Sequence, residues 1–300
     1  MIYSLVDLHA ITIRQDPVQL REWKWESLAM LLAIGLDPSR SIIFHQSTVP
    51  AHAELMWILS CQASTGYLGR MTQWKDKTAN ERENSEKLKL GLFSYPVLQA
   101  ADILVHGTTH VPVGHDQAQH LEFARELANG FNASYNRDIL RPPQTIISPA
   151  KRVMSLTDPA AKMSKSHPNP KSRIFLTDSD EDISSKIKSA VTDSIYTVSY
   201  NPQERPAVSN LVEILYHLDP DARDMSIEDY ALQLDGTNMP AFKAKLTEHV
   251  QSTVKPIRQR YEDIIADRKL LIEVRHEGKA RAKENSKKIM STVKATVGLA

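Results

Sequence analysis

The segment that decides the fold opens with Ile2-Tyr3-Ser4-Leu5-Val6 and closes with Ser41-Ile42-Ile43-Phe44, two short apolar runs. Such runs are typical of strands buried on both faces of a parallel sheet. A helix is expected between them, because Asp16 can cap its start, Pro17 suits its first turn and Gly35 can end it. This strand–helix–strand order predicts a doubly wound α/β architecture.

The next segments continue the alternation. Helices are expected at 50–61 and at 95–105, the second opened by Pro96, and a strand is expected at 109–113. That strand would deliver Gly114-His115-Asp116-Gln117 to the start of another helix. Since open parallel sheets bind ligands at the carboxyl edge, polar residues there are the first binding candidates.

From about Asp180 onward the strand-like runs become rare, and apolar residues recur at helical spacing. The two stripes are Val208, Leu211, Val212, Leu215, Leu218 and Phe242, Leu246, Val250, Val254, Ile257, Tyr261. Pro256 interrupts the second stripe and is expected to kink or divide that helix. We therefore predict a doubly wound α/β domain over 1–172 and a helical domain over 173–300, whose last helix could pack back on the first domain.

Composition fits a large domain joined to a smaller one, since a chain of 300 residues with 41% apolar and 24% charged residues can bury a substantial core. The net charge of +1 gives no argument for nucleic-acid binding, which would need a local basic surface. One such face carries Arg275, Lys279, Arg281, Lys283, Lys287, Lys288 and Lys294. It is either a solvated helix surface or a phosphate contact.

The single cysteine, Cys61, excludes an internal disulfide framework and a cysteine-cluster metal site, and we expect it to be a small core residue. The longest apolar stretch, Leu28 to Leu36, is about half of the roughly 20 residues that a membrane span needs, so no membrane association is expected. The run Met1 to Asp7 has the character of neither a transit peptide nor a secretion signal.

The pentapeptide Lys162-Met163-Ser164-Lys165-Ser166 carries the most specific chemistry. Two lysines three positions apart on a loop can neutralise the charge that develops when a triphosphate loses pyrophosphate. This is the KMSKS signature of class I aminoacyl-tRNA synthetases. A chance match or a solvated basic turn is the alternative for the pentapeptide taken alone.

Together with the pentapeptide, four strings resemble tryptophanyl-tRNA synthetase. They are Val6-Asp7-Leu8-His9-Ala10-Ile11-Thr12, Met71-Thr72-Gln73-Trp74-Lys75-Asp76-Lys77, Tyr95-Pro96-Val97-Leu98-Gln99-Ala100-Ala101-Asp102-Ile103-Leu104 and Val111-Pro112-Val113-Gly114-His115-Asp116-Gln117. Tyr3 to Asp7 and Gln99 look nearer to the mitochondrial branch. The resemblance implies a Rossmann-like catalytic domain and a helical anticodon-binding domain. It also implies a homodimer, tRNA(Trp) as partner, and ATP and Mg²⁺ as cosubstrates without a tightly bound protein metal. The location it implies is the mitochondrial matrix, with the cytoplasm as the alternative.

The resemblance also assigns residues. It implies that Lys162 and Lys165 are the catalytic clamps on the triphosphate, and that Lys77 is a further candidate for a phosphate contact. The implied tryptophan-binding residues are Asp102, Tyr95, Gln99 and Gln117. The implied ATP-binding residues are Gly114, His115, Asp116, Val153, Lys162, Met163, Ser164, Lys165 and Ser166.

Asp102 can also be weighed from its own surroundings. It lies on an apolar helical run, where an ionised carboxylate is costly unless it is paired or binds a ligand. Indole nitrogen is a donor only, so a buried carboxylate can accept from it, and an amino acid without that donor would lose roughly 1–3 kcal/mol. The alternative is a helix aspartate bonded to a neighbouring backbone group or lysine. For His9 a structural role and a ligand contact are equally favoured.

The sequence departs from the family at three places. His115 stands where glutamate is usual, and His167 stands where aspartate is usual. The family's first strand, with its HIGH-like motif, has no counterpart before Met1, so the expected sheet lacks its first strand. The chain as written is therefore expected to show negligible ATP-dependent tryptophan activation. The alternatives are a non-catalytic protein that binds tRNA or a synthetase subunit, and a tyrosyl-specific synthetase of the same fold.

Overall fold

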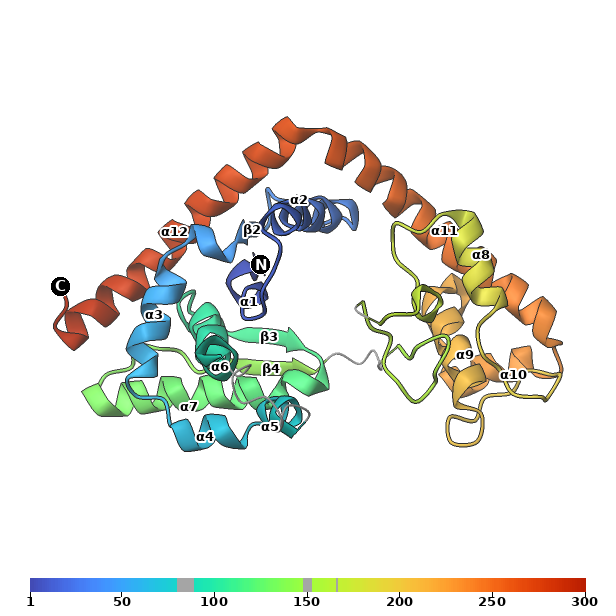
Figure 1. The fold of residues 1–300 in the computed structure, drawn as a ribbon, viewed down its shortest axis with the longest axis horizontal. Coiled ribbons are helices and arrows are strands. Elements are labelled where there is room, and N and C mark those ends of the chain that lie inside the picture. The colour runs from blue at the N-terminus through green and yellow to red at the C-terminus, as the bar shows by residue number, and fades with distance from the viewer. Residues whose placement is uncertain (80–88, 148–152, 166) are drawn as a thin grey trace. The chain divides into compact units, whose positions relative to one another are not determined.

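The computed structural model describes residues 1–79, 89–147, 153–165 and 167–300 (Figure 1). The chain divides into two compact units, 1–149 with 264–300, and 150–263. These bounds are drawn from spatial contacts and differ from the predicted domains 1–172 and 173–300. The predicted division stays a prediction about domains that fold independently.

The first unit contains the predicted strand–helix–strand segment. Strand β1 (Ile2–Leu5) pairs in parallel with β2 (Ile42–His45), and α2 (Pro17–Ala33) connects them. The Asp16 side chain caps α2 by accepting from the backbone N–H groups of Val18 and Gln19 at 3.0 and 2.8 Å. Gly35 follows the helix with a φ of 102°, which favours glycine. The prediction of this segment is confirmed.

Burial differs between the two strands. Helix α12 (Arg268–Val297) packs on β2, which is mostly buried, whereas β1 is partly exposed along its length. Gly278 permits the close approach of α12, because a Cβ there would lie 1.8 Å from the carbonyl oxygen of Ile43. The expectation of burial on both faces is therefore wrong for β1.

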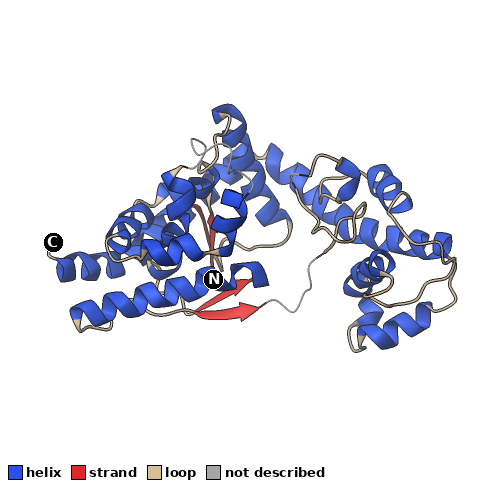
Figure 2. Cartoon of the chain, turned by 60° about the horizontal axis from the view of Figure 1, so that its bottom comes forward, coloured by secondary structure: helices blue, strands red, loops and turns tan. Residues whose placement is uncertain are grey.

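A second parallel pair joins β3 (His110–Val113) to β4 (Gln144–Ile147), drawn as red arrows in Figure 2. His110 lies opposite Gln144 in this pair. The described residues thus form two separate two-stranded parallel sheets. Strand β3 was predicted and β4 was not. Around the sheets lie α1 (Asp7–Ala10), α3 (Ala51–Ser60), α4 (Thr65–Arg70), α5 (Thr72–Ala79), α6 (Leu90–Leu104) and α7 (Ala118–Tyr135), with short 3₁₀ turns η1 (Gln46–Thr48) and η3 (His115–Gln117).

Two local predictions in this unit were wrong. Helix α6 begins at Leu90, so Pro96 lies inside it and does not open it. The helix is already established by backbone bonds from Leu92 and Phe93 to the carbonyl of Lys89. Cys61 is exposed and is not a core residue, because it follows the last residue of α3 and lies beyond that helix's buried face.

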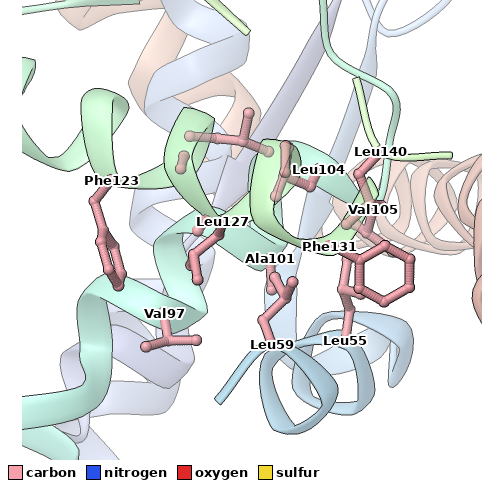
Figure 3. Close-up of a cluster of buried hydrophobic side chains, with 14 of the residues drawn as sticks. Leu55, Leu59, Val97, Ala101, Leu104, Val105, Phe123, Leu127, Phe131 and Leu140 are labelled. Carbon is pink, nitrogen blue, oxygen red and sulfur yellow. The ribbon is translucent and has the colours of Figure 1, made fainter. Parts of the chain in front are cut away.

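The core of the first unit lies between α3, α6 and α7. Figure 3 shows Leu55 and Leu59 from α3 against Val97, Ala101 and Leu104 from α6 and Phe123, Leu127 and Phe131 from α7. Met290 and Val293 of α12 belong to the same buried cluster. This core places α6, which carries several predicted site residues, in a fixed setting.

The second unit is helical, as predicted. It contains η4 (Pro170–Ser172), α8 (Asp180–Lys188), α9 (Pro206–Leu218), η5 (Pro220–Ala222), α10 (Ile227–Leu234) and most of α11 (Met239–Ala266). Both predicted stripes supply buried residues to one cluster, including Leu211 and Leu215 of α9 and Phe242 and Leu246 of α11. Helix α11 continues through Pro256, so the helix is not divided there, and a kink at this proline stays a prediction. None of the described helices is long and apolar enough to cross a membrane.

Candidate active-site residues

Asp102 lies on α6, and its side chain is 11% exposed. Both carboxylate oxygens accept from Gln46 Nε2 at 2.8 Å, and Oδ1 also lies 2.6 Å from His52 Nδ1. His9 Nδ1 lies 3.8 Å from Oδ2. These partners come from η1, α3 and α1, so the alternative of a neighbouring backbone group or lysine was wrong. The buried charge is instead held by polar side chains from three other elements.

Tyr95 and Gln99 lie on the same helix, at positions i and i+4, seven and three residues before Asp102. Gln99 Nε2 donates to Gln117 Oε1 at 3.2 Å, and His120 Nδ1 lies 3.2 Å from the same oxygen. Tyr95 O–H donates to Gln73 and lies 3.3 Å from His120 Nε2. The structure thus brings three of the four predicted tryptophan-binding residues into one network.

Sequence reasoning missed Gln73 and His120 in this network. Burial lowers the pKa of His120, and burial raises the pKa of Tyr95. Both groups are therefore uncharged at neutral pH. The spacing of His120 three residues after Gln117 was the available signal, because such residues share one face of a helical turn.

His9 lies between the two networks. Its ring is 6.1 Å from the Tyr95 ring, centroid to centroid, and its Nδ1 contacts Gln46 and approaches Asp102. Its Nε2 is buried without a hydrogen-bond partner. One ring nitrogen therefore has a structural role, and the other remains a candidate ligand contact.

The carboxyl end of β3 carries the predicted ATP segment. Gly114 permits the Asp116 carboxylate to fold back, since a Cβ at Gly114 would lie 2.8 Å from Asp116 Oδ1. Asp116 Oδ2 accepts from Gln117 Nε2 at 3.0 Å, which connects this segment to the network of Tyr95 and Gln99. The side chain of His115 lies outside the described residues, as does that of Lys77 on α5.

The lysine loop lies in the second unit and is held by backbone pairing. Met154 and Lys162 form an antiparallel bridge, and Met163 N–H donates to the Val153 carbonyl at 3.0 Å. Lys162 and Lys165 are exposed, Ser164 is partly buried, and Ser166 lies outside the described residues.

Asn210 on α9 forms hydrogen bonds to the backbone of Met154, which belongs to this paired segment. This role was not predicted from the sequence. Asn210 Oδ1 accepts from Met154 N–H at 2.9 Å, and its Nδ2 donates to the Met154 carbonyl at 3.1 Å. The side chain is buried within the apolar stripe of α9. An asparagine among buried apolar positions was the available signal, because a buried amide needs partners.

Val153 and Met163 contribute to an apolar cavity of about 260 Å³ in the second unit. Its other lining residues include Ile174, Leu176, Ile214 and Val250. The backbone bond between Val153 and Met163 explains why two residues ten positions apart share one surface. Their contact with adenine stays a prediction. Among the described residues, no group of three or more His, Cys, Asp or Glu side chains could hold a metal ion.

Comparison with known proteins identifies the family to which the chain belongs. Residues 1–255 match the family model of class I tRNA synthetases (W and Y). The tryptophan–tRNA ligase of Halalkalibacterium halodurans is 43% identical over 297 residues, which cover 99% of this chain and 87% of the relative. The mitochondrial tryptophan–tRNA ligase of Schizosaccharomyces pombe is 39% identical over 308 residues, which cover 99% of this chain and 84% of the relative.

Solved structures agree. The tryptophanyl-tRNA synthetase of Mycoplasma pneumoniae has a TM-score of 0.88 and 32% identity, covering 99% of this chain and 88% of that one. The enzyme of Campylobacter jejuni, complexed with ADP and tryptophan, has a TM-score of 0.80 and 30% identity, covering 99% and 89%. The fold and its residues are those of the class I synthetases for tryptophan and tyrosine. Within that class, the chain belongs to the tryptophan–tRNA ligase family. A tyrosyl-tRNA synthetase of Aeropyrum pernix, at 22% identity, shares the fold alone.

Proposed function

We propose that this protein binds tryptophan, activates it with ATP and transfers it to tRNA(Trp), which is the activity of its family. The expectation of negligible activation stays a prediction, which the pyrophosphate exchange described below tests. The observation that carries the proposal is Asp102, an acceptor held nearly out of solvent on the helix face that also carries Tyr95 and Gln99. A carboxylate in this setting selects a ligand with a buried N–H donor, and tryptophan is the amino acid whose apolar side chain ends in a donor-only nitrogen. Family membership supports the same substrate.

The chemistry requires no covalent enzyme nucleophile. The tryptophan carboxylate attacks the α-phosphorus of ATP, pyrophosphate leaves, and the terminal ribose hydroxyl of tRNA then takes the aminoacyl group from the adenylate. The protein's contribution is positioning and charge stabilisation. Lys162 and Lys165, both exposed on their loop, supply positive charge to the departing phosphates. Mg²⁺ belongs to the proposal as a partner of the ATP phosphates, its usual mode in phosphoryl sites.

The remaining site residues have proposed roles of positioning. Tyr95 and Gln117 face the amino group of tryptophan, and Gln99 lines the indole pocket. The segment Gly114 to Asp116 contacts the nucleotide, with the Asp116 carboxylate accepting from ribose hydroxyls. Val153 and Met163 contact adenine, Ser164 and Ser166 complete the loop around the phosphates, and Lys77 is a further phosphate contact.

Assembly and location are also proposed. We propose a homodimer in the mitochondrial matrix. The location is supported by mitochondrial relatives from two yeasts, which are 39% and 40% identical to this chain. Bacterial relatives are as similar, so the cytoplasm remains the alternative. Co-localisation of the fluorescently tagged protein with a matrix marker tests the location. Sedimentation in the analytical ultracentrifuge tests the oligomeric state.

The experiment for substrate choice is calorimetric titration of the chain with tryptophan, tyrosine and ATP, followed by tryptophan-dependent pyrophosphate exchange. Asp102→Ala is expected to weaken tryptophan binding by roughly 5- to 150-fold, the equivalent of one unsatisfied buried donor, with little change for ATP. Asp138→Ala, at an exposed carboxylate, is the matched control. Absence of tryptophan binding in the wild-type chain, or equal binding by Asp102→Ala, contradicts the proposal.

A further inference from the structure

A line of hydrogen-bonded side chains extends from Asp102, through the buried His52 and His106, to the exposed Asn285 on helix α12. His52 Nδ1 lies 2.6 Å from Asp102 Oδ1, and His52 Nε2 lies 3.3 Å from His106 Nε2. His106 Nδ1 lies 2.7 Å from Asn285 Oδ1, 179 positions further along the chain. The His52 side chain is fully buried, and His106 is 9% exposed. Four residues from three helices and a loop thus form one hydrogen-bonded chain.

When Asp102 is ionised, the possible proton positions in this chain lead to one result at its carboxylate. If neutral His52 donates from Nδ1, its Nε2 accepts from His106, whose Nδ1 then accepts from the amide nitrogen of Asn285. That arrangement exchanges the assigned oxygen and nitrogen of the Asn285 amide, which are nearly indistinguishable. If the Asn285 oxygen faces His106, then His106 donates from Nδ1 and accepts from His52, which carries both protons. In both arrangements His52 Nδ1 donates to Asp102.

The surroundings of His52 and His106 limit the hydrogen-bond partners that the two rings can have. The Phe44 ring lies 5.5 Å from the His52 ring and 5.6 Å from the His106 ring, between centroids. Burial lowers the pKa of His106 to about 4, so this ring is neutral at physiological pH, as both arrangements require. The two imidazoles therefore have each other, Asp102 and Asn285 as their polar partners.

Gln46, a second hydrogen-bond partner of Asp102, is also fixed in orientation. Gln46 Oε1 accepts from the backbone N–H of Leu8 at 3.0 Å, which orients the amide so that Nε2 donates to Asp102. Oδ1 then accepts from both Gln46 and His52, whereas Oδ2 accepts from Gln46 and lies 3.8 Å from His9. Because a carboxylate oxygen has two lone pairs, Oδ2 keeps the capacity to accept one donor more.

We propose that His52 is a positioning residue, which saturates one oxygen of Asp102 and leaves the other aimed at an indole N–H. His106 and Asn285 hold the His52 ring, so selectivity for tryptophan depends on α12. This inference rests on the proposed function, since it takes Asp102 to be the tryptophan acceptor. It adds a specificity determinant that touches the carboxylate and not the ligand.

The test compares His52→Leu with His52→Asn in the full chain. The asparagine Nδ2 occupies the place of the ring Nδ1 and can donate to Asp102, whereas leucine fills the space without a donor. We expect His52→Leu to weaken tryptophan binding about tenfold, with ATP binding unchanged, and His52→Asn to recover most of the loss. A role in packing alone predicts the reverse order, because a buried apolar setting tolerates leucine better than an amide.

A double-variant cycle separates this inference from the proposed function. His52→Leu should have no further effect on tryptophan binding in an Asp102→Ala background. If Asp102→Ala leaves tryptophan binding intact, the proposed function fails. If Asp102→Ala weakens binding but His52→Leu does not, or weakens it equally in both backgrounds, the positioning role alone is overturned.

Nitrogen-15 NMR of the histidine rings tests the geometry without reference to activity. The wild-type chain should show His52 protonated at Nδ1, with a low-field proton resonance that shifts in Asp102→Ala and in Asn285→Leu. An unprotonated Nδ1 at neutral pH overturns the inference. Thermal unfolding of each variant identifies a change that only impairs folding, and the wild-type spectrum decides the question if His52→Leu does not fold.

Discussion

The buried side-chain amide of Asn210 bonds to both the N–H and the carbonyl of Met154, and so fixes the backbone there. Substitution of Asn210 by leucine would leave the N–H and carbonyl of Met154 without these partners. We expect Asn210→Leu to lower the free energy of unfolding by about 2–3 kcal/mol, the cost of leaving two backbone groups unsatisfied. Urea unfolding measures this, with Gln233→Leu on an exposed position of α10 as control. A loss no larger than in the control would show that Met154 finds other partners.

His106 predicts a pH dependence of stability. Burial lowers its pKa from 6.5 to about 4 in the folded chain, so below pH 6.5 the unfolded chain binds a proton that the folded chain does not. The free energy of unfolding should therefore fall as the pH drops from about 6.5 to about 4, by up to about 3 kcal/mol from this group. His106→Phe should lose this part of the dependence. Parallel unfolding profiles for the two proteins between these pH values would contradict it.

Several site residues could be predicted from the sequence because they conflict with their surroundings or form a rare motif. Asp102 is a charge on an apolar helix, and Lys162 and Lys165 belong to a specific pentapeptide. The partners of Asp102 could not be predicted in the same way. Gln46 and His52 meet it across 56 and 50 positions, and nothing in their local pattern specifies that pairing.

At the scale of elements, the contact between α12 and β2 depends on Gly278. An added Cβ would meet the carbonyl oxygen of Ile43 at 1.8 Å, so the helix or the strand must move. We expect Gly278→Ala to lower the free energy of unfolding by at least about 3 kcal/mol, the upper range for overpacking. Gly130→Ala on α7 is the matched control, because its Cβ would meet nothing within 4 Å. It should stabilise by about 0.5–1 kcal/mol. Equal effects in the two variants would show that α12 can shift without cost.

The predicted basic face of α12 divides into two parts. Arg281 donates to the carbonyls of Pro38 and Ser41 at 2.6 and 3.2 Å, and Lys294 pairs with Glu54 at 2.5 Å. These cations have structural roles. Lys283, Lys287 and Lys288 are exposed along the same helix. These three lysines are exposed positions of the face that are available to phosphates.

Replacing Lys283, Lys287 and Lys288 by glutamine is therefore expected to weaken the binding of different tRNAs to a similar extent. It should also flatten the dependence on salt by up to about one unit of slope for each lost phosphate contact. Filter binding at several salt concentrations measures both. Arg281→Gln should instead lower stability. Binding that is unchanged by the triple substitution would assign these lysines to a solvated surface.

Elements with strong end signals could be predicted, and those without them could not. Helix α2 has both a capping aspartate and a terminating glycine, and it begins and ends where expected. Strand β4 is four residues long and mostly exposed, so it lacks the buried run that identified the other strands. The start of α6 was predicted wrongly because proline is usual in the first turn of a helix. In this helix Pro96 lies inside, where tertiary packing tolerates it.

At the scale of the whole molecule, the two units differ in how their cores are assembled. Among the described residues, the buried cluster of the second unit runs from Leu156 to Val254, and Arg205 pairs with the exposed Asp193 at 2.7 Å in the same unit. The first unit needs Met290 and Val293 from α12. The sequence predicted a helical region after residue 172, with a last helix that could pack back on the first domain. It could not identify the surface that α12 covers, because amphipathic periodicity does not identify the partner of a helix.

This difference predicts the behaviour of fragments. A fragment of residues 150–263 should fold alone with a cooperative thermal transition, since its core is self-contained. A fragment of residues 1–149 should not, and adding a peptide of residues 264–300 should restore helix content and a transition. Circular dichroism during heating measures both. A cooperative transition for 1–149 without the peptide would show that α12 is dispensable to its core.

The position of α12 in the chain also orders folding during synthesis. Arg281 contacts Pro38 across 243 positions, so residues 150–263 are synthesised before α12 is available to the first unit. We therefore expect the second unit to reach its final form first, while the core of α3, α6 and α7 still lacks the residues that α12 supplies. Chaperones that bind nascent chains should accordingly recognise this protein through its earlier half, and should leave it when α12 emerges from the exit tunnel.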